Sequence, residues 1–426
     1  MNYSAIPWAS IRKWVALCSV VALPWQTRFV ARERWLNGFP WEQGRWSFYA
    51  TWILMLVLIA WSVYEHRRQW TRRSVQYAVG AIVVACFALI HSASLVASAQ
   101  WMFQIAVLGG WVWAMRDARI PVQTVGTWFV YSLIPVGVLA CVQWVTQHTF
   151  AASWLGLAGH VPADLGASIV ETAHGRWLRV YGSFPHPNIA GIWFAIGAYV
   201  SAVYYTELRS RVYAFAAITL SAPLFFTQSR AAVLALIVGL IVLCVRHVSR
   251  EAKRMLWGVG ALFLMLTSLY SWVVLPRFSG TAPAEVRSTH ERLTAFSQGW
   301  ELFSLHPLLG AGPNAAGEVW YEQHPWRDTS DHAEPYIPLH NVFFLLVVEL
   351  GVIGTGALIW LLYRAHRAHA VSFWVFPPVE GAFLVLAIFS FFDHAAWSWW
   401  SGQSLVALTI LLLDMPRARP LIYTHQ

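Results

Sequence analysis

Residues 338–363 read PLHNVFFLLVVELGVIGTGALIWLLY, and this stretch decides the fold class. Glu349 is its single charged residue, and the run exceeds the ~20 residues that a helix needs to cross a bilayer. Similar runs recur along all 426 residues, of which 58% are hydrophobic and 12% are charged, against about 25% charged in soluble domains. The sequence therefore predicts an all-α polytopic membrane protein, since the alternation expected of membrane barrel strands is absent.

The apolar runs predict about twelve transmembrane helices in a single integral membrane domain that covers residues 1–426. The first run is short and interrupted by Pro24, and we expect it to remain as a signal anchor. The seventh and eighth runs meet at Arg230 with almost no loop between them. The expected spans are 14–30, 46–64, 74–91, 95–115, 122–146, 188–206, 211–229, 231–247, 255–275, 339–363, 373–394 and 399–415.

Basic residues in short loops predict the orientation of these spans. Arginines crowd the loops at 65–73 and 246–254, and such loops stay on the cytoplasmic side. Both termini are therefore expected in the cytoplasm. Two longer segments, about 147–187 and 276–338, then fall on the outer face. Neither is long enough for a large separate domain, so we expect both to lie on the membrane surface as lids or short amphipathic helices.

Charge and cysteine content narrow the class of partner. The formal net charge is +9, and loop arginines of membrane proteins meet anionic lipid headgroups. We therefore expect membrane lipids as partners, and no nucleic acid. All the cysteines lie inside apolar runs, which indicates packing rather than disulfides or a metal site. No internal repeat is visible, which weakens the interpretation of the chain as a transporter built from inverted repeats.

His340 is the first candidate for chemistry. It follows Pro338 and Leu339 and precedes Asn341, at the start of the tenth span. Backbone N–H groups at a helix start favour a nearby anion. They also favour a neutral imidazole, which is the form that a general base needs. The competing interpretation is a purely structural histidine at a membrane boundary.

Two arginines are expected to reach the same outer face. Arg230 lies between two apolar runs with no other charge nearby, and an ionisable group at such a place is a functional candidate. Arg292 lies at the edge of an apolar stripe on a predicted amphipathic helix that Ser288 and Glu291 would cap and that ends near Pro307. The alternatives are a snorkelling helix end for Arg230 and a solvated or headgroup-bound side chain for Arg292.

Further polar residues lie at the end of the first outer segment and at the outer end of a later span. Arg179 is a possible third cation, and Asn188 after Pro187 suits a helix start, so capping is its alternative role. Asp393 and His394 stand at the outer end of a span and are read as a local ion pair. No acidic pair with metal-ligand spacing accompanies the outer candidates, so arginine alone would balance a bound phosphate.

Four motifs in order resemble a known family. They are GSFPHPN at 182–188, TQSRAA at 227–232, HPLLGAGPN at 306–314, and His340-Asn341 followed by Glu349-Leu350-Gly351. Together they resemble the O-antigen ligase/polymerase superfamily, and most closely its O-antigen ligase branch. The resemblance implies a GT-C-like fold in the bacterial inner membrane with the active site on the periplasmic face.

The resemblance also implies a reaction. O-polysaccharide would pass from undecaprenyl pyrophosphate to lipid A–core oligosaccharide by inverting transfer, without metal or other cofactor. The essential histidine of this family corresponds to His340, and its two arginines correspond to Arg230 and Arg292. Arg179, Asn188 and Asn341 are expected to contact substrate.

Alternatives to this reaction remain open. An O-antigen polymerase or a protein O-oligosaccharyltransferase would use the same donor with another acceptor. A flippase or exporter of the lipid-linked glycan would carry out no transfer.

Overall fold

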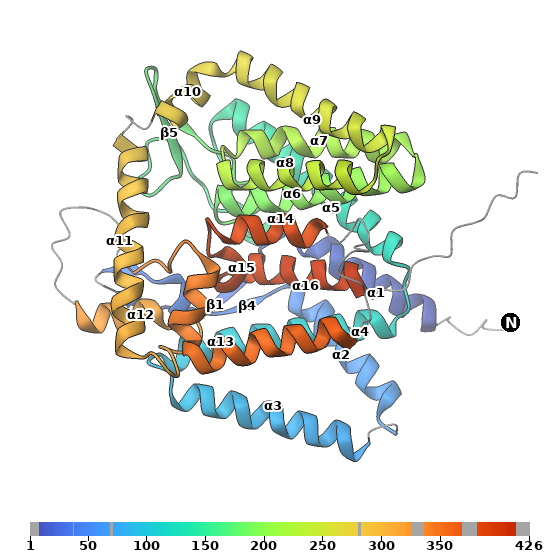
Figure 1. The fold of residues 1–426 in the computed structure, drawn as a ribbon, viewed down its shortest axis with the longest axis vertical. Coiled ribbons are helices and arrows are strands. Elements are labelled where there is room, and N and C mark those ends of the chain that lie inside the picture. The colour runs from blue at the N-terminus through green and yellow to red at the C-terminus, as the bar shows by residue number, and fades with distance from the viewer. Residues whose placement is uncertain are drawn as a thin grey trace, which may run out of the picture.

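A computed structural model describes residues 8–36, 38–68, 71–279, 283–324, 336–368 and 381–414. The described chain is mostly helical, and most of its long helices stack beside one another (Figure 1). The helices are α1 (Trp8–Ala22), α2 (Thr51–His66), α3 (Arg72–Ile90), α4 (Leu95–Asp117), α5 (Val122–Thr146), α6 (Pro187–Leu208), α7 (Arg211–Phe226), α8 (Arg230–Arg246), α9 (Arg250–Leu269), α10 (Ser271–Ser279), α11 (Pro283–Leu305), α12 (Ala316–Gln323), α13 (Val342–Ala368), α14 (Gly381–Ser390), α15 (Ala395–Ser398) and α16 (Trp400–Asp414).

Several of these helices match a membrane in length and composition. Within the described residues, five are long and apolar enough to cross one, namely α4, α5, α6, α9 and the Val342–Arg364 part of α13. Shorter apolar helices add Thr51–His66, Val79–Ile90, Arg211–Phe226, Gly381–Ser390 and Trp400–Leu413. The polytopic helical class is therefore confirmed, and the count of twelve spans stays a prediction.

Several predicted spans have boundaries that differ from those of the described helices. The first helix ends at Ala22, two residues before Pro24, because proline has no N–H to continue the helix. The chain then forms strand β1 (Arg28–Arg32), which pairs antiparallel with β4 (Trp46–Tyr49). Between them, β2 (Trp35–Leu36) pairs with β3 (Phe39–Pro40). In the eleventh span the described helix stops at Ser390 and a turn follows.

The two long segments also differ in detail from expectation. Segment 147–187 contains one short 3-10 helix, η2 (Ser153–Leu155), and a hairpin of β5 (Ile169–Thr172) and β6 (Gly175–Leu178) that had not been predicted. In segment 276–338, α11 begins at Pro283, so position 288 lies inside the helix and not at its start. The predicted stop before Pro307 is correct. Figure 1 shows α11 running across the ends of other helices, and it contacts α12, α13 and the hairpin.

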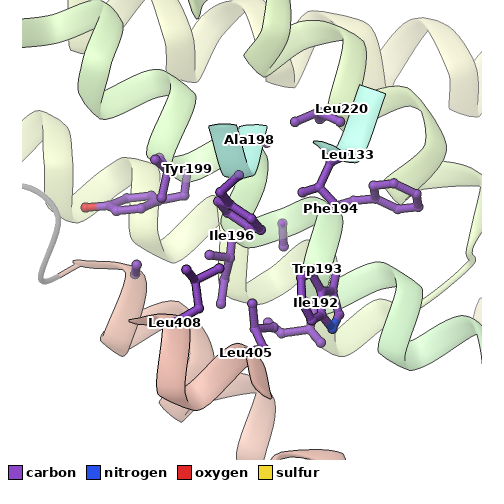
Figure 2. Close-up of a cluster of buried hydrophobic side chains, with 14 of the residues drawn as sticks. Leu133, Ile192, Trp193, Phe194, Ile196, Ala198, Tyr199, Leu220, Leu405 and Leu408 are labelled. Carbon is purple, nitrogen blue, oxygen red and sulfur yellow. The ribbon is translucent and has the colours of Figure 1, made fainter. Parts of the chain in front are cut away.

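The core of the molecule is built around α6. Its neighbours are α5, α7, α8, α14 and α16, and 89% of its apolar window is buried. Figure 2 shows its side chains, including Trp193 and Tyr199, among leucines from α5, α7 and α16. Such enclosure holds α6 firmly, because close-packed interiors leave side chains little freedom. The first residues of α6 are therefore fixed in space.

The HPLLGAGPN motif holds a kink in α13. Gly351 has a left-handed φ of +63°, which interrupts the helical hydrogen bonds. The N–H groups of Ala311 and Gly312 donate instead to the carbonyls of Val348 (3.0 Å) and Glu349 (2.9 Å). In return, the N–H groups of 352 and 353 donate to the carbonyls of 307 and 308. The loop thus clamps the half of α13 that follows His340.

Glu349 extends this clamp to α15. Its buried carboxylate accepts hydrogen bonds from the Asn314 N–H at 2.6 Å and from the Trp397 indole N–H at 2.5 Å. α15 follows the Asp393–His394 turn directly. The HPLLGAGPN loop and Glu349 therefore fix the position of the start of α13 relative to the Asp393–His394 turn.

Candidate active site

Three segments far apart in sequence meet at the candidate site, namely the starts of α6 and α13 and the turn between α14 and α15. His340 precedes α13, and its ring meets that of His394 edge to face, with centroids 5.2 Å apart. Asp393 accepts a hydrogen bond from the Asn188 side-chain amide at 2.9 Å and another from the Ala395 N–H at 2.9 Å. A buried carboxylate therefore stands beside two imidazole rings.

Burial governs the protonation of this cluster. Burial alone would raise the pKa of Asp393, but His394, His340 and His186 outweigh it and lower that pKa. Burial lowers the pKa of His340, with Asp393 opposing this and Arg292 adding to it. Burial also lowers the pKa of His394 to about 4, although the negative charge of Asp393 opposes this shift. At neutral pH an ionised Asp393 therefore faces neutral imidazoles, and a neutral imidazole can accept a proton.

Arg179 joins the cluster through Asn188. Its Nε donates to the Thr227 carbonyl at 2.8 Å, and its Nη2 donates to Asn188 Oδ1 at 2.6 Å. The Asn188 side chain thus bridges Arg179 and Asp393. Burial lowers the pKa of Arg179 to about 10, so the side chain stays charged at neutral pH.

Arg230 is the first residue of α8, and it belongs to a second group of charged side chains. Its Nη1 donates to the Arg277 carbonyl at 2.7 Å, and its Nη2 lies 2.9 Å from a carboxylate oxygen of Glu285. The Arg277 guanidinium pairs with the same carboxylate and donates to the Gln228 carbonyl at 3.0 Å. Burial, followed by repulsion from other arginines, lowers the pKa of Arg277 to about 8. A single buried glutamate therefore holds two arginines.

The four guanidinium groups of Arg179, Arg230, Arg277 and Arg292 form one electrostatic unit, called here the arginine cluster. Arg277 is influenced by the other three, and Arg179 by Arg292 and Arg230. Burial lowers the pKa of Arg292, and Arg230 adds to the effect. Two buried carboxylates, Glu285 and Asp393, act on these four cations. Two positive charges remain without a buried partner, which suits a polyvalent anion.

Two cavities of different character meet at His340. The larger, of about 430 Å³, is lined by Arg28, Glu42, Trp41 and Trp399, and its inner end is formed by His340, Asp393 and His394. The smaller, of about 220 Å³, is mostly apolar. Its lining residues are Arg292, Ala295, Phe296, Leu339, His340, Asn341, Phe391 and Phe392. His340 thus separates a polar space from an apolar space that has a guanidinium at its edge.

The chain was compared with known proteins. Residues 189–359, less than half of the chain, match the family model described as O-antigen ligase. This segment of the chain is similar to the O-antigen ligase family. No curated protein matches the chain. The matched segment contains Arg230, Arg292 and His340, whereas Arg179, Asn188 and Asp393 lie outside it.

The predicted site residues occupy neighbouring but distinct positions. His340 and Arg292 line one cavity. Arg230 instead donates to the Arg277 carbonyl and pairs with the Glu285 carboxylate. Asn341 caps α13, since its Oδ1 accepts the Phe344 N–H at 2.9 Å while its Nδ2 donates to the Phe391 carbonyl at 3.1 Å. Its expected contact with substrate stays a prediction.

Three residues of this arrangement were given no role in the site from the sequence. Asp393 had been read as a local ion pair, yet it bonds to Asn188, which is 205 residues away. Arg277 and Glu285 lie within a segment whose pattern shows only amphipathic character. Among the described residues, no group of three or more His, Cys, Asp or Glu side chains could hold a metal ion.

Proposed function

We propose that the protein transfers O-polysaccharide from undecaprenyl pyrophosphate to lipid A–core oligosaccharide at the periplasmic face of the bacterial inner membrane. One observation carries the proposal. His340, neutral at physiological pH, stands between a polar and an apolar cavity beside an arginine cluster that has more guanidinium groups than buried carboxylates. An amphipathic donor with a pyrophosphate needs this combination of surfaces.

The arginine cluster binds the pyrophosphate in this proposal. Arg292 stands at the edge of the apolar cavity, where the first isoprene units of the lipid carrier would lie. Arg230 approaches from α8, and Arg277 supports it through Glu285. Guanidinium groups donate two parallel hydrogen bonds to phosphate oxygens. They also stabilise the charge that develops on the leaving oxygen as its bond to the sugar breaks.

His340 acts as the general base. It accepts the proton of the acceptor hydroxyl, whose oxygen attacks the anomeric carbon from the face opposite to the pyrophosphate. The new glycosidic bond forms as the bond to pyrophosphate breaks, so the configuration inverts and no metal is needed. Such base catalysis supplies about 10²–10⁴-fold. Asp393 stabilises the imidazolium that forms and, through Asn188, keeps Arg179 nearby.

The deciding experiment uses purified protein, undecaprenyl-pyrophosphate-linked glycan and lipid A–core in detergent, with the product read on a gel. Transfer in detergent, where there are no sides to move between, would exclude a pure flippase. Replacing lipid A–core with a second lipid-linked glycan, or with an acceptor protein, tests the polymerase and the protein O-oligosaccharyltransferase. Full activity of His340→Ala, or complete loss with a chelator, would contradict the mechanism.

A further inference from the structure

A second polar cavity adjoins the one that His340 closes. It has a volume of about 270 Å³ and is called here the distal chamber. Four residues, Arg28, His160, Pro185 and Trp399, line both cavities. The two spaces are therefore neighbours along one path that leads away from His340, and the apolar cavity shares none of these four residues.

The lining of the distal chamber combines aromatic rings with uncharged hydrogen-bonding groups. Tyr181, which stacks on His160 at 4.7 Å, contributes one ring, and Trp399 contributes another. The uncharged polar side chains are those of Gln26, Tyr49, Thr149, Ser153 and Ser401. Ser401 is only 1% exposed, and its hydroxyl has no hydrogen-bond partner among the described residues. A buried hydroxyl without a partner is costly unless a ligand satisfies it.

Charge separates the distal chamber from the arginine cluster. Arg28 is the one charged side chain in its lining, and the carboxylate of Glu42 pairs with that guanidinium. Arg45 also reaches Glu42, at 2.7 Å, and pairs with Glu33 at 2.8 Å. These two arginines and two glutamates balance each other. His160 adds no charge at neutral pH, because burial lowers its pKa against the opposing effect of Asp164.

We propose that the distal chamber is a saccharide subsite that holds a neutral sugar of the acceptor, one unit away from the sugar that His340 deprotonates. The proposal rests on the proposed function. Balanced charge disfavours a phosphorylated sugar, whereas rings and hydroxyls suit an uncharged one. The chamber lies on the polar side of His340, where the acceptor enters, and away from the apolar cavity of the lipid carrier.

Filling the chamber tests this assignment. Ala158 lines the chamber from an exposed loop, so Ala158→Trp should occupy the space with little effect on packing. We expect the KM for lipid A–core to rise about tenfold, which corresponds to about 1.4 kcal/mol. The kcat and the KM for the lipid-linked donor should stay within twofold. Ala163→Trp is the matched control, since Ala163 is equally exposed in the same segment and does not line the chamber.

Ser401→Ala gives a second measurement that does not depend on tolerance of a bulky residue. Its hydroxyl has no partner within the described protein, so its loss should not lower the melting temperature, while the KM for lipid A–core rises severalfold. An unchanged KM in both Ala158→Trp and Ser401→Ala, with an active wild type, would overturn the subsite. A wild type that transfers no glycan would overturn the proposed function itself.

The charge assignment has its own control. Lipid A–core from which phosphate has been removed should show the same rise in KM with Ala158→Trp as the intact acceptor. If the rise disappears with the dephosphorylated acceptor, the chamber holds a phosphorylated sugar, and its assignment to a neutral unit is wrong.

Discussion

At the scale of the residue, the proposed role of Arg230 depends on the geometry of its guanidinium group as well as on its charge. It donates in two directions, to a backbone carbonyl and to Glu285. A lysine has one compact ammonium and cannot reproduce this fork. We expect Arg230→Lys to lower kcat about 10²-fold in the detergent transfer assay. Arg287→Lys, on the exposed part of α11, is the control and should stay near wild type. Near-normal turnover of Arg230→Lys would exclude direct contact with pyrophosphate.

Asp393 should shift the pH dependence of the reaction. Its negative charge raises the pKa of His340 against the effect of burial. In the wild type, kcat/KM should fall on acidification as pH drops through the pKa of His340, which lies below 6.5. Asp393→Asn removes the favourable charge, so this acid limb should move to lower pH while the maximal rate falls. The measurement is kcat/KM between pH 4 and 8, and a limb moving to higher pH would contradict the assigned interaction.

Individual residues were predictable only where local sequence marks them. His340 stands at a helix start after a proline, and Arg230 stands alone between apolar runs, so both can be picked from the chain. Asp393 cannot be picked in this way, because its partner Asn188 is distant in sequence. Arg277 cannot be picked from the sequence either. Its role depends on Glu285, whose buried carboxylate pairs with both Arg230 and Arg277.

At the scale of the element, the kink of α13 should control the site. An added Cβ at Gly351 would lie 2.3 Å from the Leu308 carbonyl oxygen, in a left-handed conformation. We therefore expect Gly351→Ala to cost about 2 kcal/mol or more and to lower both the melting temperature and activity. Gly356→Ala is the control in the same helix, since a Cβ there meets nothing within 4 Å. Equal melting temperatures of the two variants would contradict the clamp.

Helices were predictable as elements because their apolar runs are long. The strands were not, since β1–β4 are short and their pairing spans residues that the apolar pattern assigned to helices or loops. The hairpin at 169–178 was missed for the same reason. The motif HPLLGAGPN marked the end of α11 correctly through Pro307, but its hydrogen bonds to the α13 kink depend on tertiary structure.

At the scale of the whole molecule, the proposed orientation can be measured by labelling. Arginine-rich short loops predict that the α8–α9 connection lies in the cytoplasm and α11 outside. Single cysteines at Val248 and Thr289, both exposed positions, should then differ in a background whose four native cysteines are replaced. We expect an impermeant maleimide to label Thr289→Cys in spheroplasts and to label Val248→Cys only after lysis. Labelling of both from outside would contradict the topology.

The near-complete enclosure of α6 has a consequence for how the protein responds to its membrane. Its apolar window is 89% buried, whereas those of α9 and α13 are each 22% buried. A thicker or thinner bilayer therefore acts first on the outer helices, which meet acyl chains, and reaches α6 only through protein contacts. The N-terminal end of α6 anchors Asn188 and, with it, Asp393. We therefore expect the polar half of the candidate site to respond less to lipid composition than the outer helices do.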